Sequence, residues 1–411
     1  MNIKNRLKVM LFLQYFVWGS WLITSGSYMM QTLGFSGSDV GIVVSSFGIA
    51  SLFMPCLVGV IADKWVSAKY LYILCHLIGA IALFFAASVS NPMIMFMVML
   101  LNMLAYMPSI SLSNSISYFC LDNHKHDTVT AFPRIRVFGT VGFIAAMWLI
   151  SLLKIEESNT QFYIASASSL LLVIYSLTLP YVPVGKKESQ TWISRLGLDA
   201  LVLFKQPTMA VFFLFAMLLG AVLQITNTFG NPFLQDFKFI PEYKDSLVVQ
   251  YPAILLSISQ MAEIGFILAI PFFLKRFGIK QVMIISMLAW TLRFGLFAFG
   301  DPSPFGFVLL LLSMIVYGCA FDFFNISGSI FIEKEVSPAI RASAQGLFMT
   351  MVNGIGSYIG SILSGKVVDK YTTIDNVKDW QSIWLVFAAY ALLLAVIFYF
   401  TFREKNKLKN V

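Results

Sequence analysis

Charged residues are scarce in this chain of 411 residues. Only 12% are Asp, Glu, Lys or Arg, whereas about 25% is typical of soluble domains. Hydrophobic residues make up 58% of the chain, and the mean hydropathy is +0.81. The apolar content extends from end to end, so no stretch has the composition of a soluble domain. The scarcity of charge therefore excludes an ordinary soluble protein and indicates a polytopic membrane protein.

Cysteine and histidine are also few. The four cysteines, Cys56, Cys75, Cys120 and Cys319, lie in or beside apolar segments and form no C-x-x-C pair. We therefore expect free thiols, no metal site and no cofactor. The chain has no phosphate-binding G-x-x-x-x-G-K-[ST] motif, no H-E-x-x-H and no nucleophile elbow. These absences argue against ATP-driven transport by this chain and against an enzyme.

A helix that spans the membrane needs about 20 mostly apolar residues. By this measure the chain contains about twelve spans, and we read the first as a retained helix because its apolar run is too long for a signal peptide. The predicted spans cover, approximately, residues 9–31, 38–62, 70–89, 93–119, 132–153, 161–182, 208–234, 248–274, 279–299, 305–332, 341–368 and 380–402.

Basic residues are distributed unevenly over the connections between these spans. Twenty Lys and Arg fall on the side that holds both termini and 6 on the other. The positive-inside rule then places both termini in the cytoplasm. The net charge of +8 is explained by this asymmetry, so we expect a membrane-lipid environment and no nucleic-acid partner.

The longest polar connection divides the chain into two halves. It covers residues 184–207 and separates an N-terminal bundle of six helices, residues 1–183, from a C-terminal bundle, residues 208–411. Two pseudo-symmetric halves are the layout of transporters that bind substrate at the repeat interface. The sequence thus predicts an all-α membrane protein with twelve helices in two bundles.

Two acids interrupt apolar spans of the C-terminal half. Glu263 lies in the eighth predicted span and Asp322 in the tenth. An ionised carboxylate in hydrocarbon costs roughly 3 kcal/mol on insertion scales, so acids retained there usually face protein or water. Both residues are therefore candidates for proton coupling and for substrate contact.

Other polar and aromatic residues lie within apolar spans of both halves, spaced so that neighbours share one helix face. Arg136, Thr140 and Phe143 are spaced at i, i+4 and i+7 in the fifth span, which places them on one face. Amides that merely stitch helices together contribute below about 2 kcal/mol each, but polar pairs in three helices favour a shared aqueous pocket. The C-terminal candidates are Gln224, Asn227, Gln260, Glu263, Tyr317, Phe321 and Asp322.

The turn after the second span reads Gly59-Val-Ile-Ala-Asp63-Lys64-Trp65. A glycine followed by an acid and a base at a tight turn resembles the cytoplasmic signature of the major facilitator superfamily. We expect Asp63 and Lys64 to act in gating, by stabilising one state of the transporter. The alternative is an ordinary charged turn.

Several longer motifs are more specific. They include Phe132-Pro-Arg134-Ile-Arg136, Leu223-Gln224-Ile-Thr-Asn227, Ser259-Gln260-Met-Ala-Glu263 and Tyr317-Gly-Cys-Ala-Phe321-Asp322-Phe-Phe-Asn325. Over nearly its whole length the chain resembles the nucleoside:proton symporter family of the major facilitator superfamily. The resemblance implies import of purine and pyrimidine nucleosides with protons across the bacterial inner membrane. It implies a nucleoside pocket formed by Arg136, Thr140, Phe143, Gln224, Asn227, Gln260, Glu263, Tyr317, Phe321 and Asp322.

The mechanism expected from these residues is alternating access driven by a proton. At least one of Glu263 and Asp322 carries the proton, and the residues themselves do not rank the two. The alternatives are a proton symporter for another polar solute, such as a sugar, and a membrane receptor that binds without transporting. A monomer is the expected state, with nucleoside and proton as the partners.

Overall fold

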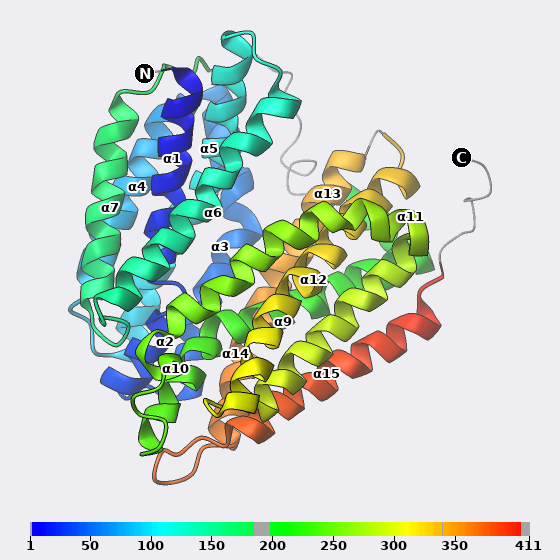
Figure 1. The fold of residues 1–411 in the computed structure, drawn as a ribbon. Helices are drawn as coiled ribbons and strands as arrows, with labels where there is room; N and C mark the ends of the chain where they lie inside the picture. Colours follow the sequence, from blue (N-terminus) through cyan, green and yellow to red (C-terminus); the bar gives the residue numbers. More distant parts are fainter. Residues whose placement is uncertain (1, 185–197, 339, 404–411) are drawn as a thin grey trace. The chain divides into compact units, whose positions relative to one another are not determined.

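The computed structural model describes residues 2–184, 198–338 and 340–403, except for the side chains at positions 63, 129 and 198. Nearly all of this part is helical (Figure 1). Within the described ranges the only β pairing is an isolated bridge between Thr372 and Lys378. The predicted all-α class is therefore confirmed.

The first helices follow the predicted order, with caps that explain where several of them begin. Pro92 starts one helix at a position where its missing N–H costs nothing, and Asn91 accepts hydrogen bonds from the next two free amides. The elements are α1 (Ile3–Gly19), α2 (Ser25–Ser27), η1 (Tyr28–Thr32), α3 (Gly37–Lys64), α4 (Ala68–Ala86), α5 (Pro92–Asn123), α6 (Thr128–Leu152) and α7 (Thr160–Leu177).

The remaining elements begin after the predicted linker, of which residues 185–197 lie outside the described part. They are η2 (Leu198–Lys205), α9 (Pro207–Asp236), η3 (Phe237–Phe239), α10 (Leu247–Gln250), α11 (Pro252–Phe299), α12 (Pro304–Glu335), α13 (Arg341–Met349), η4 (Thr350–Gly356), α14 (Ser357–Lys370) and α15 (Trp380–Thr401).

Ten stretches of helix in the described residues are long and apolar enough to cross a membrane. The stretch α11 contains two predicted spans, because Gly278 breaks the helical backbone with φ 79° and ψ 172°. This left-handed conformation favours glycine. The helix α1 has 17 residues, which is just short of a full span. These two features reconcile ten apolar helices with the twelve predicted spans.

The first span differs from its prediction. It was predicted as one helix over residues 9–31, but α1 ends at Gly19 and a short irregular segment precedes α2. The hydroxyl of Ser20 donates to the carbonyl of Phe16 at 2.7 Å, and Thr24 donates to Gln161 at 2.6 Å. Hydroxyl side chains that bond locally or to other helices compete with the helical backbone pattern, which explains the break.

The helices form two compact units. Unit 1 comprises Met1–Ser189, Ile225–Ser257 and Ser361–Asp369, and unit 2 comprises Gln190–Gln224, Ile258–Gly360 and Lys370–Val411. The helices α9, α11 and the segment from α13 to α14 thus contribute residues to both. The predicted division at the 184–207 connection stays a prediction.

In unit 1, α1 packs against α6 and α7, α4 against α5 and α7, and α3 against α5 (Figure 1). The interior also holds a polar cluster, in which Gln14 donates to Ser109 at 2.8 Å and accepts from Tyr72 at 2.6 Å. The imidazole of His76 lies 2.7 Å from the same Gln14 oxygen. Because its polar groups are paired with one another, this cluster stabilises the bundle interior.

A carboxylate joins α14 to α3 within unit 1. Asp369 accepts hydrogen bonds from the backbone amides of Gly37, at 2.6 Å, and Ser38, at 2.9 Å. These amides belong to the first turn of α3, where backbone N–H groups lack helical partners and a negative charge is favourable.

Aromatic packing dominates unit 2. Phe212 of α9 contacts Phe324 and Phe331 of α12. Trp384 of α15 stacks on Phe294 of α11 with an interplanar angle of 16°. These large apolar contacts hold α9, α11, α12 and α15 together, and thereby position the polar residues that α11 and α12 carry.

Candidate functional site

The two acids predicted from the sequence lie close together in unit 2. Asp322 of α12 is buried, Glu263 of α11 is half-buried, and their charges interact. One oxygen of Asp322 has no hydrogen-bond partner among the described residues. A buried polar atom without a partner is unusual in a folded protein, so this carboxyl group is available to a proton or to a bound solute.

A glycine allows this approach of α11 and α12. A Cβ atom added to Gly318 would lie 2.7 Å from the backbone nitrogen of Glu263 and 2.8 Å from the carbonyl group of Ala262. Such distances are far below van der Waals contact, so only glycine fits at this crossing. The close crossing is what brings the carboxyl groups of Glu263 and Asp322 into one cluster.

Flat side chains lie next to the acids on α12. The rings of Tyr317 and Phe321 are stacked, with centroids 6.0 Å apart and an interplanar angle of 6°. Phe321 and Asn325 also line a small cavity in unit 2 together with Trp290. An aromatic ring bordering a cavity is suited to bind a planar group such as a nucleobase.

Arg293 of α11 contacts α12 next to Tyr317. Its guanidinium donates to the carbonyl of Ser313 at 2.9 Å and to Ser259 at 3.3 Å, and it lies 4.6 Å from the ring centre of Tyr317. Its side chain is only 2% exposed. Because its bond to Ser313 joins α11 to α12, Arg293 has a structural role in unit 2.

Two amides complete the predicted residues of unit 2. Gln224 of α9 is buried and donates to Ser357 at 3.3 Å. Gln260 of α11 lies one turn before Glu263, and its side-chain oxygen has no hydrogen-bond partner in the described part of the chain. Gln224 is therefore partly committed to a structural contact, whereas Gln260 retains a free acceptor.

The predicted residues Arg136, Thr140, Phe143 and Asn227 belong to unit 1. The guanidinium carbon of Arg136 lies 4.1 Å from the ring centre of Tyr15 on α1. Gly139 makes room for this contact, because a Cβ atom there would lie 2.7 Å from both groups. Arg136 is therefore held by stacking and does not simply extend toward the membrane surface.

Phe143 also packs against α1. Its ring meets that of Trp18 edge to face, with centroids 6.2 Å apart, and Trp18 in turn contacts Phe47 and Tyr106. The sequence reasoning assigned no role to Tyr15 or Trp18. Their spacing of three residues, which puts both on one face of α1, was the available signal.

Two further predictions concern gating and metals. Lys64 is exposed at the end of α3, and the side chain of Asp63 lies outside the described residues. The gating role of this pair stays a prediction. Among the described residues no group of three or more His, Cys, Asp or Glu is arranged to hold a metal ion.

Replacing Tyr15 by leucine is expected to raise the KM for transported solute about fivefold. The reason is that a partly desolvated cation–π contact contributes about 1 kcal/mol, and its loss frees Arg136 from its position. Concentration-dependent uptake measures the effect. Tyr15→Phe keeps the ring and should stay near the parent value. An unchanged KM in Tyr15→Leu would show that the ring does not position Arg136.

Apolar helices with acids and an arginine in their interior are typical of a membrane transporter. A family model described as Nucleoside H+ symporter matches residues 1–407. The chain is 68% identical to the xanthosine permease of Escherichia coli, over 100% of this chain and 99% of that one. It is 58% identical to the nucleoside permease NupG of E. coli, over 99% and 97%.

Solved structures agree with these matches. The crystal structure of the nucleoside transporter NupG superposes with a TM-score of 0.94 at 58% identity, covering 98% of this chain and 100% of that one. A mutant form of NupG superposes with a TM-score of 0.96. The chain therefore belongs to the nucleoside–proton symporter family, with the major facilitator fold.

Family membership confirms several predictions made from the sequence. The protein is a transporter and not an enzyme, and its function is proton-coupled nucleoside import. It is an integral membrane protein, which in bacteria means the inner membrane. The sugar symporter and the non-transporting receptor are thereby set aside.

Proposed function

We propose that this protein imports purine and pyrimidine nucleosides by alternating access, with the proton carried by Glu263, Asp322 or both. The observation that supports this best is the close pair of carboxyl groups beside the stacked rings of Tyr317 and Phe321. Two nearby carboxylates disfavour full ionisation of both, so a proton is readily shared there. The adjacent rings offer a surface for a base.

The proposed substrate-binding residues divide by chemistry. Rings stack on the base, amides pair with its edges, and ionised acids accept from ribose hydroxyls. Arg136 and Thr140 supply donors from α6. The full set is Arg136, Thr140, Phe143, Gln224, Asn227, Gln260, Glu263, Tyr317, Phe321 and Asp322.

We further propose that both termini face the cytoplasm, as the 20 to 6 distribution of basic residues indicates,. Asp63 and Lys64 then lie at the cytoplasmic surface, where they are proposed to stabilise one gating state. The proposed functional unit is a monomer surrounded by membrane lipid. It uses the proton as coupling ion and no cofactor.

The relative named xanthosine permease suggests a wider substrate range. At 68% identity over the whole chain, this protein shares most of the residues of that relative. We propose that xanthosine is a substrate together with uridine.

Uptake into proteoliposomes under a pH gradient tests the proposed function. Radiolabelled uridine and xanthosine should accumulate when the outside is acidic, and a protonophore should abolish accumulation. Unlabelled nucleosides should compete, whereas free bases and sugars should not. Accumulation that is blocked by a sugar, or binding without accumulation, would contradict the proposal.

A further inference from the structure

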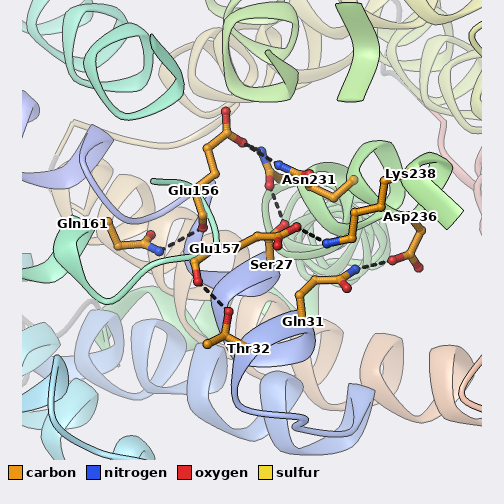
Figure 2. A network of polar contacts seen from close by, with 10 residues as sticks. Ser27, Gln31, Thr32, Glu156, Glu157, Gln161, Asn231, Asp236 and Lys238 are labelled. Carbon is orange, nitrogen blue, oxygen red and sulfur yellow. Dashed lines mark hydrogen bonds and ion pairs between the residues drawn. The ribbon is translucent and has the colours of Figure 1, made fainter. Parts of the chain in front are cut away.

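Glu156 is a buried acid outside the residues considered so far. It lies in the connection between α6 and α7 and is only 3% exposed. Figure 2 shows its carboxyl group bonded to Asn231 of α9, in a polar network whose labelled residues all belong to unit 1. A carboxyl group is rarely buried in a surface connection without a specific reason.

Both oxygens of Glu156 accept hydrogen bonds from other segments. Asn231 of α9 donates to one oxygen at 2.6 Å, and Gln235 of α9 lies 3.5 Å from the same atom. The backbone amide of Ala253 in the first turn of α11 donates to the other oxygen at 3.2 Å. One carboxyl group therefore connects the α6–α7 connection to the end of α9 and the start of α11.

The side chain of Asn231, which donates to Glu156, is itself held in position by a further hydrogen bond. Ser27 of α2 donates to the side-chain oxygen of Asn231 (Figure 2). This bond turns the amide nitrogen of Asn231 toward Glu156. The contact therefore includes a fourth segment, and its geometry does not depend on Glu156 alone.

The charged groups nearby have other partners. On the same connection, Lys154 donates to Gln250 at 2.6 Å and Glu157 pairs with Lys238 of η3 at 2.5 Å. At the end of α9, Asp236 accepts from Gln31. The first two turns of α11 and the first turn of α7 contain no charged residue, and on η1 the titratable group is Tyr28. Among the described residues, the groups that donate to the Glu156 carboxyl group are uncharged amides, with the hydroxyl of Ser151 beside them.

Burial raises the pKa of Glu156 above its ordinary value, and the hydrogen bonds from Ser151, Asn231, Ala253 and Gln235 offset part of the rise. A raised pKa means that the packed state binds a proton more tightly than the separated state does. Packing of these segments is therefore favoured as the pH falls. It weakens as the pH rises through the pKa of the buried group.

We propose that Glu156 is a proton-binding site separate from Glu263 and Asp322, and that its carboxyl group latches the ends of α9 and α11 to the α6–α7 connection. The inference rests on the proposed orientation, which places this connection on the periplasmic side. Opening toward the periplasm then separates these segments and exposes Glu156. Closing buries it and takes up a proton from the outside.

A buried reporter on α11 allows the latch to be tested. Ser257 is fully buried and lies one turn beyond Ala253, where it accepts a hydrogen bond from Trp148 of α6 at 2.9 Å. We would replace the four native cysteines by alanine, introduce Ser257→Cys, and measure its reaction with a membrane-impermeant maleimide in whole cells. Rates at pH 6 and pH 8 are divided by those of the detergent-denatured protein, which removes the pH dependence of the thiol.

Three variants at one position give distinct expected results. With Glu156 the corrected rate should rise severalfold from pH 6 to pH 8. Glu156→Gln resembles the protonated acid, so labelling should stay slow at both pH values. Glu156→Ala removes the latch, so labelling should be fast at both. If the glutamine variant keeps the pH dependence of the parent, or the alanine variant does not accelerate labelling, the proposal is wrong.

Two controls separate the latch from other causes. Glu157→Gln removes the neighbouring, partly exposed acid and its ion pair with Lys238, and should keep the pH dependence of the parent. If Glu156→Ala does not reach the membrane, Asn231→Ala removes the 2.6 Å donor and should also speed labelling; no acceleration in that variant would overturn the latch.

Nucleoside uptake, measured in the same cells, tests the proposed function separately from the latch. The expected labelling pattern without nucleoside uptake would leave the latch standing and overturn the proposed function. Labelling of Ser257→Cys from the cytoplasmic side only, in inside-out vesicles, would overturn the orientation and with it the role of Glu156.

Discussion

At least one of the two substitutions Asp322→Asn and Glu263→Gln is expected to abolish uphill nucleoside uptake. Each substitution keeps the size of the side chain and removes its titration. A carrier that binds no coupling proton can only equilibrate its substrate, because no differential proton binding biases its two states. We expect the initial rate of uptake under a pH gradient to fall by more than about tenfold, in keeping with the usual effect of removing a proton-transfer group.

Exchange of internal for external nucleoside distinguishes loss of coupling from loss of folding. The variant that keeps exchange but loses accumulation identifies the proton carrier. Glu333→Gln is a matched control, since Glu333 is an exposed acid on the same helix that pairs with Arg341 at 2.7 Å. If both Asp322→Asn and Glu263→Gln still concentrate nucleoside with the parent pH dependence, neither acid carries the proton.

The second large effect is expected from Gly318→Ala. The added methyl group meets the backbone of Ala262 and Glu263 at 2.7 to 2.8 Å, and backbone cannot move aside as a flexible side chain can. Overpacking of this kind typically costs about 1–3 kcal/mol. Because the clash separates the helices that carry the two acids, we expect both a lower melting temperature and a nearly complete loss of uptake.

Gly265→Ala is the matched control for this substitution. Gly265 lies on α11 two residues after Glu263, and nothing lies within 4 Å of a Cβ atom built there. Alanine at a helical glycine with free space stabilises by about 0.5–1 kcal/mol, so its melting temperature should stay equal or rise. Thermal unfolding in detergent and uptake in cells measure both variants. Equal behaviour of the two would refute the close crossing at Gly318.

The sequence predicted the membrane helices well because their signal is composition over about 20 residues. The break between Gly19 and Ser25 was missed for the same reason. Residues in this segment are as apolar as the helix around them, and the break depends on hydroxyl contacts such as Thr24 with Gln161. A window of hydropathy does not record such contacts.

The candidate site was predicted through side chains that are costly in lipid. Glu263 and Asp322 stand out because an acid in an apolar helix has few structural explanations. Tyr15 and Trp18 do not stand out, since aromatic residues are ordinary in membrane helices. Glu156 was missed because it lies in a polar connection, where an acid is expected to be solvated. Its carboxyl group is covered in part by segments more than 70 residues away along the chain.

The contact of Asp369 with the start of α3 has a consequence for sequence variation. The donor of its 2.9 Å bond from position 38 belongs to the main chain, so that position can change to any residue except proline and still donate. Position 369 has no such freedom, because the acceptor is the side chain itself. We therefore expect related sequences to vary at position 38 and to retain the aspartate at position 369.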